Sequence, residues 1–235
     1  MSVNYQKKKS EAFLVQEIYA AYREFRNSEG IKLAKRFVKK NKTNQVVWKI
    51  LGELYKRAND IPRAILAYRR AIYLMPGDAN AHINLGLLLK SNNQKIDAEK
   101  NYRQALTLDP NSTLAMNNLA NSLRQSGKVE EAEKLCRDAL KIDPKYDMAL
   151  INLAIILDYQ DGVSERISIL NNLVNSENKL INLQAMTHLA ITTYLRNQFD
   201  ESRDLLARSK EIQNINNSIL DNEKKYHIYL SKILS

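Results

Sequence analysis

The sequence predicts an all-α fold, a right-handed solenoid of stacked antiparallel helix hairpins. The chain of 235 residues contains only six glycines and four prolines. Average usage is about 7% and 5%, so few turns are left for a many-stranded sheet. In addition, "ALTLDPNS" at residues 105–112 returns as "ALKIDPKY" at residues 139–146, 34 positions later. A period of this length is typical of proteins in which small helical units stack on one another.

Three prolines set the register of the repeats. Pro76, Pro110 and Pro144 are each 34 residues apart, so residues 45–78, 79–112 and 113–146 align as three units. In each unit a leucine and, four residues later, a tyrosine or leucine share one face of a first helix. Glycine or alanine follows the first leucine and allows close approach of a second helix. We expect the turns between the paired helices at Asn59, Asn93 and Gly127, which tolerate left-handed backbone angles.

The first unit carries the most complete set of these residues: Trp48, Leu51, Gly52, Tyr55, Ala64, Tyr68, Ala71 and Pro76. Their spacing resembles the tetratricopeptide repeat (TPR) family, in which each repeat is a helical hairpin. The resemblance implies a protein-interaction scaffold that holds an extended peptide or a partner helix in a concave groove.

The flanking segments are expected to extend this array to five or six hairpins. Residues 1–44 are predicted to form a divergent N-terminal hairpin or cap, with helices over residues 10–27 and 29–40. Residues 147–216 are predicted to form two degenerate TPR-like hairpins, the first with Arg166 in place of a small residue. We expect its second helix to pack differently. Residues 217–235 are predicted to be a capping helix, which shields the last core face.

The glycine, histidine and cysteine residues do not have the spacing of known catalytic or ligand-binding motifs. The glycines form no phosphate-binding loop, and His82, His188 and His227 lack metal-ligand spacing. The single cysteine, Cys136, occupies a core position, so we expect it to be buried, and it favours a cytoplasmic location. No stretch has the roughly 20 apolar residues of a membrane span. The sequence therefore predicts no enzyme activity, no cofactor, no metal ion and no membrane partner.

An asparagine recurs where the helical core does not require one. Asn84, Asn118 and Asn152 precede the packing leucine in consecutive first helices, a position that the TPR resemblance places on the concave surface. Asparagine is about 0.6 kcal/mol worse than alanine in a helix, and its amide can pair with any peptide backbone. Such a ladder is similar to that of the TPR region of O-linked N-acetylglucosamine transferases, which holds protein substrates. Inheritance from a duplicated repeat is the alternative explanation.

A basic row accompanies the asparagines at Lys56, Lys90 and Arg124, and it would favour an acidic peptide. An ordinary solvated charged face is the alternative explanation. We add Lys49, Asn117 and Asn121 to this candidate peptide-binding surface. The family's clamp for a C-terminal carboxylate is rejected, because Glu53, Leu114 and Asn118 stand where it needs asparagine and basic residues.

The net charge of +10 arises entirely in the first third of the chain. Residues 1–78 hold 17 Lys plus Arg and 7 Asp plus Glu, a surplus of 17 − 7 = +10, and the remainder holds 19 of each. This surplus raises nucleic-acid binding as a less favoured alternative, because no known nucleic-acid module is present. A further alternative is the substrate-docking component of a protein glycosyltransferase system whose catalytic part lies elsewhere.

Overall fold

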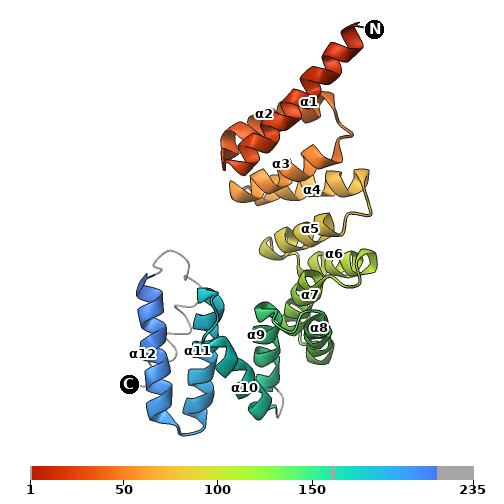
Figure 1. The fold of residues 1–235 in the computed structure, drawn as a ribbon. Helices are drawn as coiled ribbons and strands as arrows, with labels where there is room; N and C mark the ends of the chain where they lie inside the picture. Colours follow the sequence, from red (N-terminus) through yellow and green to blue (C-terminus); the bar gives the residue numbers. More distant parts are fainter. Residues whose placement is uncertain (1, 160–161, 216–235) are drawn as a thin grey trace. The chain divides into compact units, whose positions relative to one another are not determined.

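The structure is a computed structural model that describes residues 2–159 and 162–215, and all regular elements in these ranges are helices (Figure 1). The chain divides into two compact units, Met1–Ser122 and Leu123–Ser235, and each unit is described by itself. The predicted capping helix over residues 217–235 lies outside the described residues. The prediction of an all-α fold of stacked helical hairpins is confirmed.

The first unit contains three helical hairpins and the start of a fourth. Its helices are α1 (Ser2–Arg23), α2 (Asn27–Lys40), α3 (Gln45–Arg57), α4 (Ile61–Leu74), α5 (Ala79–Ser91), α6 (Lys95–Leu108) and most of α7 (Thr113–Gln125). Each odd-numbered helix up to α5 packs against the next one, and α2 and α4 also pack against the helix that follows them (Figure 1). Neighbours in sequence are therefore neighbours in space.

Glycine on the first helix and tyrosine on the second hold two of these hairpins together. A Cβ atom on Gly52 would lie 2.6 Å from Cδ2 of Tyr68, and one on Gly86 would lie 2.5 Å from Cε1 of Tyr102. Both tyrosine side chains are almost fully buried. The absence of a side chain at each glycine lets the aromatic ring lie directly against the backbone of the first helix.

The turns inside the hairpins adopt the left-handed backbone conformation that the sequence predicts. The φ angles are 57° at Asn59, 60° at Asn93 and 78° at Gly127, and Asn197 repeats this turn with 61°. Asparagine and glycine are the residues that tolerate these angles best. The short hairpin turns are therefore encoded residue by residue.

Helices α3, α4 and α5 are each capped at their start by a side chain. Asn44, Asp60 and Asp78 each accept a hydrogen bond from the backbone amide three residues later, at 3.0, 3.2 and 3.0 Å. Such caps satisfy amide groups that have no partner within the helix. Pro62 is the second residue of α4, where proline is tolerated.

The first hairpin differs in detail from the prediction, because α1 begins at Ser2 rather than near residue 10 and ends at Arg23. Its turn contains Phe25 at φ 57°. The guanidinium group of Arg57 on α3 lies over the rings of Tyr22 and Phe25, 4.1 and 4.7 Å from their centroids. It also donates a hydrogen bond of 2.7 Å to the Tyr22 carbonyl oxygen. Arg57 therefore ties this turn to the first repeat.

The second unit continues with helical hairpins. It contains α8 (Val129–Ile142), α9 (Asp147–Ile156), the 3₁₀ turn η1 (Leu157–Tyr159), α10 (Val163–Leu173), α11 (Lys179–Leu195) and α12 (Phe199–Ile215). Its main core cluster includes Ala154 with Leu170, and Ala190 with Leu206. These pairs occupy the positions of Gly86 and Tyr102 in later repeats.

Arg166 marks the departure that the sequence predicts in this unit. It stands where three earlier repeats have alanine, and its side chain is only 3% exposed. One guanidinium nitrogen donates to Asp158, whereas Nε and Nη2 have no hydrogen-bond partner among the described residues. Burial lowers the pKa of Arg166, although Asp158 acts in the opposite direction. The helix that carries it, α10, has 11 residues, whereas α8 has 14.

Candidate functional site

Two of the predicted asparagines lie at equivalent positions on α5 and α7 of the first unit. Asn84 and Asn118 are both half-buried. The amide nitrogen of Asn118 donates a hydrogen bond of 2.9 Å to the carbonyl oxygen of Leu114, one turn earlier. The side chain of Asn84 makes no hydrogen bond with any residue that the structure describes. Asn84 therefore keeps both a donor and an acceptor for another molecule.

The other predicted asparagines are bound up in the fold. Asn117 is 3% exposed, Asn121 is half-buried, and both have interaction partners of their own. Asn152, predicted as the third member of the ladder, belongs to the second unit and is only 4% exposed. Its helix, α9, packs against α8, α10 and α11. The open part of the predicted ladder consequently lies in the first unit.

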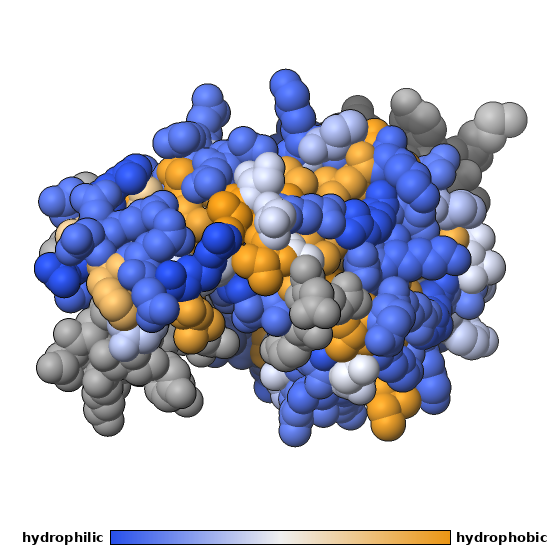
Figure 2. Space-filling view, turned by 90° about the horizontal axis from the view of Figure 1, so that it is seen from below, coloured by the Kyte–Doolittle hydropathy of each residue, from blue (hydrophilic) through white to orange (hydrophobic). Residues whose placement is uncertain are grey.

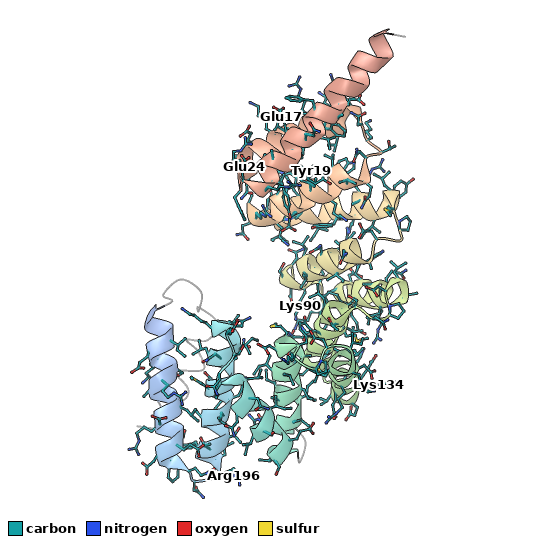
Figure 3. The ribbon with its side chains drawn as sticks, in the orientation of Figure 1. Glu17, Tyr19, Glu24, Lys90, Lys134 and Arg196 are labelled. Atoms are coloured by element: carbon teal, nitrogen blue, oxygen red, sulfur yellow. The ribbon has the colours of Figure 1, made fainter. Side chains whose placement is uncertain are left out.

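The basic residues of the candidate surface take part in ion pairs or other contacts. The Nζ atom of Lys49 lies 2.6 Å from Asp78, and that of Lys56 lies 2.7 Å from Glu53. Lys90, near the C-terminal end of α5 (Figure 3), and Arg124, in the second unit, also have interaction partners. Both lysine side chains are about one third exposed, so an acidic ligand can reach them and compete with Asp78 and Glu53.

Asp78 connects the first repeat to the second. Its carboxylate accepts hydrogen bonds from Lys49 at 2.6 Å and from Gln45 at 2.8 Å, and it caps α5. Burial raises the pKa of Asp78, but the bonds from Lys49, the Ala81 amide and Gln45 together outweigh burial and lower it overall. The carboxylate is therefore held in its charged form by both neighbouring repeats.

Burial shifts the pKa values of Cys136 and His188, two residues of the types that serve in catalysis or metal binding. Cys136 is fully buried, as predicted, and burial raises the pKa of its thiol to about 12. Burial, assisted by the charge of Arg166, lowers the pKa of His188 to about 4. Among the residues that the structure describes, there is no group of three or more His, Cys, Asp or Glu side chains that could hold a metal ion.

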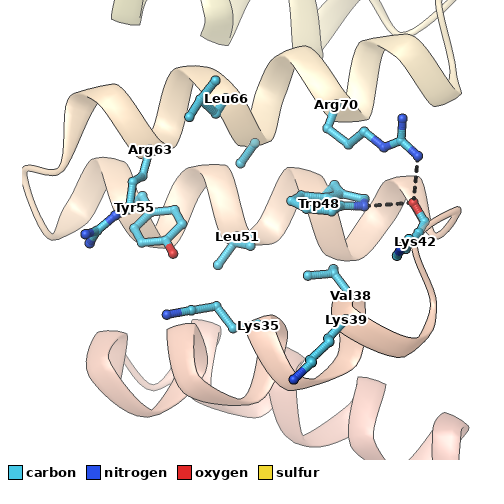
Figure 4. A pocket seen from close by; sticks show the side chains of 11 residues that line it. Lys35, Val38, Lys39, Lys42, Trp48, Leu51, Tyr55, Arg63, Leu66 and Arg70 are labelled. Atoms are coloured by element: carbon cyan, nitrogen blue, oxygen red, sulfur yellow. Dashed lines mark hydrogen bonds between the residues drawn. The ribbon is translucent and has the colours of Figure 1, made fainter.

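A groove on the first unit was not predicted from the sequence. It has a volume of about 700 Å³ and lies between α2, α3 and α4 (Figure 4). Its lining is aliphatic and aromatic with a basic edge: Lys35, Val38, Lys39, Lys42, Trp48, Leu51, Tyr55, Arg63, Leu66, Ala67 and Arg70. Leu66 was the one sign of this groove in the sequence: it is an apolar residue where the next two repeats have Lys100 and Lys134.

Apolar residues reach the surface elsewhere too. Figure 2 shows one face on which hydrophobic residues stand among hydrophilic ones. Large exposed side chains include those of Tyr73 and Ile96, which are 74% and 75% exposed. Such single residues are normal on protein surfaces, whereas contiguous apolar lining is typical of binding sites. The groove belongs to the second kind of surface. None of the helices in the described ranges is long and apolar enough to cross a membrane.

Hairpins that recur every 34 residues define this chain as an α-helical repeat protein. Two models of the tetratricopeptide repeat match it, one at residues 83–147 and one at residues 182–215. These two segments are therefore TPR repeats, and TPR proteins are in general non-catalytic scaffolds for protein or peptide partners. No curated protein sequence matches it significantly.

Solved structures with a similar fold include several TPR proteins. PilF of Pseudomonas aeruginosa has a TM-score of 0.74 and 11% identity, with 97% of this chain and 99% of that chain covered. YrrB, described as a TPR protein with an unusual peptide-binding site, has a TM-score of 0.61 and 15% identity, with 85% and 97% covered. MamA from Desulfovibrio magneticus has a TM-score of 0.64 and 15% identity, with 69% and 92% covered. At these identities the similarity concerns the fold alone.

Proposed function

We propose that this protein is a non-catalytic scaffold that binds an extended peptide along the first helices of its repeats. Asn84 and Asn118 pair with the peptide backbone, and nearby lysines favour acidic side chains. The observation that carries this proposal is the half-buried amide of Asn84, which has no hydrogen-bond partner among the described residues. A peptide amide and carbonyl would satisfy it.

The two asparagines suit a ligand that is recognised by its main chain. They stand one repeat apart, at the same position of α5 and α7. A side-chain amide offers a donor and an acceptor, as a peptide unit does, so pairing is independent of the ligand's sequence. Asn152 is left out of this binding surface because it is buried. Asn117 and Asn121, which have partners of their own, are expected to position the row.

The lysines supply the preference for charge. Lys49 and Lys56 are about one third exposed and already lie beside carboxylates, at 2.6 and 2.7 Å. To form an ion pair with one of these lysines, a carboxylate of a bound peptide would have to replace Asp78 or Glu53, because neither lysine is without a partner. We therefore expect a modest preference for acidic peptides that weakens with salt.

The test uses an array of immobilised short peptides of varied sequence. We expect the purified chain to be retained by many extended peptides, more strongly by acidic ones. The double variant Asn84→Ala with Asn118→Ala should lose this retention across sequences. It should also be as stable as the parent or more stable, because alanine is the better helix former.

The matched control is Asn80→Ala with Asn92→Ala, which removes two exposed asparagines in and next to α5. This control should retain the same peptides as the parent. Equal retention by a folded Asn84→Ala, Asn118→Ala variant would show that the amide row does not bind peptides.

The glycosyltransferase hypothesis gives the same surface a different consequence, in which the held peptide is modified by a separate catalytic protein. An assay of the purified chain with a sugar nucleotide and the retained peptides tests the non-catalytic part of the proposal, for which we expect no turnover. The cytoplasmic location stays a prediction.

A further inference from the structure

We infer that the groove between α2, α3 and α4 is a second docking site, and that its occupant is a short acidic segment of a partner protein with an apolar anchor residue. It shares no residue with the amide row, so it is independent of the function proposed above. The inference depends on the groove's lining, on its charge and on its restriction to one repeat.

The lining offers a place for an apolar side chain. Trp48, Leu51 and Tyr55 lie along α3, with Val38 from α2 on one side and Leu66 from α4 on the other (Figure 4). Leu66 is 64% exposed. An apolar side chain that packs here removes its own surface and that of Leu66 from water.

The indole ring of Trp48 is held in place before any ligand binds. Its Nε1 atom donates a hydrogen bond of 3.0 Å to the carbonyl oxygen of Lys42, in the turn between α2 and α3. The guanidinium group of Arg70 on α4 also reaches this oxygen, at 3.5 Å (Figure 4). The aromatic wall and one cation of the edge are therefore organised together, which lowers the ordering that binding requires.

The edge of the groove is entirely basic. Five lysines and arginines line it, and no aspartate or glutamate does. Lys35 and Lys39 form no ion pair with any residue in the described ranges, and Arg63 pairs only with Asp60 while remaining 66% exposed. Charge complementarity therefore favours a ligand with several carboxylates.

The corresponding place in the next repeat is built differently. Its residues 34 positions later include Asp97 for Arg63, Lys100 for Leu66 and Asn101 for Ala67. There Asn101 forms a hydrogen bond of 3.0 Å with the ring of His82, the counterpart of Trp48. The second repeat thus has the polar side chains Lys100 and Asn101 where the first has Leu66 and the small Ala67.

A protein segment fits this lining better than a polyanion without apolar groups. Most contacts to nucleic acid go to phosphate and sugar. These polar groups would gain little from the apolar side chains of Val38, Leu51 and Leu66. Interface cores between proteins, in contrast, combine aromatic, aliphatic and arginine side chains. An acidic segment with a leucine or phenylalanine uses both halves of the groove.

The experiment uses the fluorescence of Trp48, which is the only tryptophan of the chain. The probe is a short synthetic peptide in which glutamates flank leucine and phenylalanine. One comparison peptide has serine in place of both apolar residues, and a second has lysine in place of glutamate. We expect saturable binding of the first peptide, at least about tenfold weaker binding of the serine peptide, and no binding of the lysine peptide.

Two variants locate the site on the protein. Leu66→Lys introduces, at an exposed position, the residue that the next two repeats have there. It should weaken binding of the probe peptide at least about tenfold. Lys35→Glu with Lys39→Glu should weaken binding of the probe peptide further and make this binding less dependent on salt concentration. The control Lys95→Glu with Lys100→Glu makes the same change in net charge on α6, away from the groove, and should bind like the parent. Circular dichroism confirms that each variant is folded.

The inference is overturned if the folded Leu66→Lys variant binds the probe as tightly as the parent, or if the serine peptide does. A single-stranded oligonucleotide, or vesicles containing phosphatidylserine, that bind more tightly and respond to Leu66→Lys would assign the groove to another occupant. The Asn84→Ala, Asn118→Ala variant should bind the probe normally, so the two sites are tested separately.

Discussion

The backbone of Gly86 lies against the ring of Tyr102, so close that a Cβ atom on the glycine would be 2.5 Å from Cε1 of the ring. Gly52 and Tyr68 repeat this relationship. In later repeats alanine takes the first position and cysteine or leucine the second, as in Ala154 with Leu170. A larger residue on the first helix thus accompanies a smaller one on the second, which indicates that this space between the helices is limited.

Gly86→Ala should destabilise the first unit by about 1–3 kcal/mol, because the added methyl group forces the buried ring of Tyr102 to move. In a Tyr102→Cys background the clash is gone, and the same change should be neutral or stabilising by up to about 1 kcal/mol, because alanine favours the helix. Urea unfolding followed by Trp48 fluorescence measures both effects in a double-mutant cycle. The control is Gly77→Ala, where a Cβ atom meets nothing within 4 Å. Additive effects of the two substitutions would contradict the proposed steric coupling.

Asp78→Asn should lower the stability of the first unit by about 1 kcal/mol at neutral pH, since it keeps a capping oxygen but loses the charged bonds to Lys49. The pKa of Asp78 is below its ordinary value when folded. Its contribution is therefore present above the unfolded pKa of about 3.9 and is lost as the pH falls through the folded pKa. Unfolding curves of both proteins should converge in acid. A stability difference that does not depend on pH would exclude the charge as its cause.

His188 should make the second unit sensitive to acid. Burial lowers its pKa to about 4, whereas an unfolded histidine has a pKa of about 6.5. Between these values the unfolded chain binds a proton that the folded chain refuses, so stability falls by on the order of 3 kcal/mol as the pH drops. His188→Gln should remove this loss. Hydrogen exchange of α11 amides at pH 7 and pH 5 measures it, and an equal loss in the variant would contradict the assignment.

Cys136 should be unreactive toward thiol reagents in the folded protein at pH 8. Its side chain is fully buried and its pKa is raised to about 12, so neither access nor the thiolate form is available. In denaturant the thiol should react completely. Labelling kinetics at increasing urea should therefore follow the unfolding of the second unit, and rapid labelling without denaturant would show that the cysteine is accessible.

The repeat period predicted much of the fold because it determines contacts between helices that are adjacent in the sequence. Gly52, Asn59 and Asn93 depend only on the helix before or after them, so their environments could be inferred from spacing. Arg166 was recognised as a departure for the same reason. The period did not predict that α1 begins at Ser2, because the first hairpin diverges from the repeat pattern.

The candidate site was less predictable because exposure depends on residues outside the repeat pattern. Asn84, Asn118 and Asn152 are equivalent in sequence, yet Asn152 is buried whereas the other two are half-buried. Lys49 finds Asp78, 29 residues away. Nothing in the spacing of the repeats indicates such a partner.

By itself, the sequence determined the helical hairpins, their turns and the glycine contacts, because a fixed period decides which side of each helix meets the next one. Only the tertiary structure decided which polar residues stay open to a partner. It also created the groove at Trp48 and Leu66, because a hollow between three helices depends on the volumes that all of them contribute.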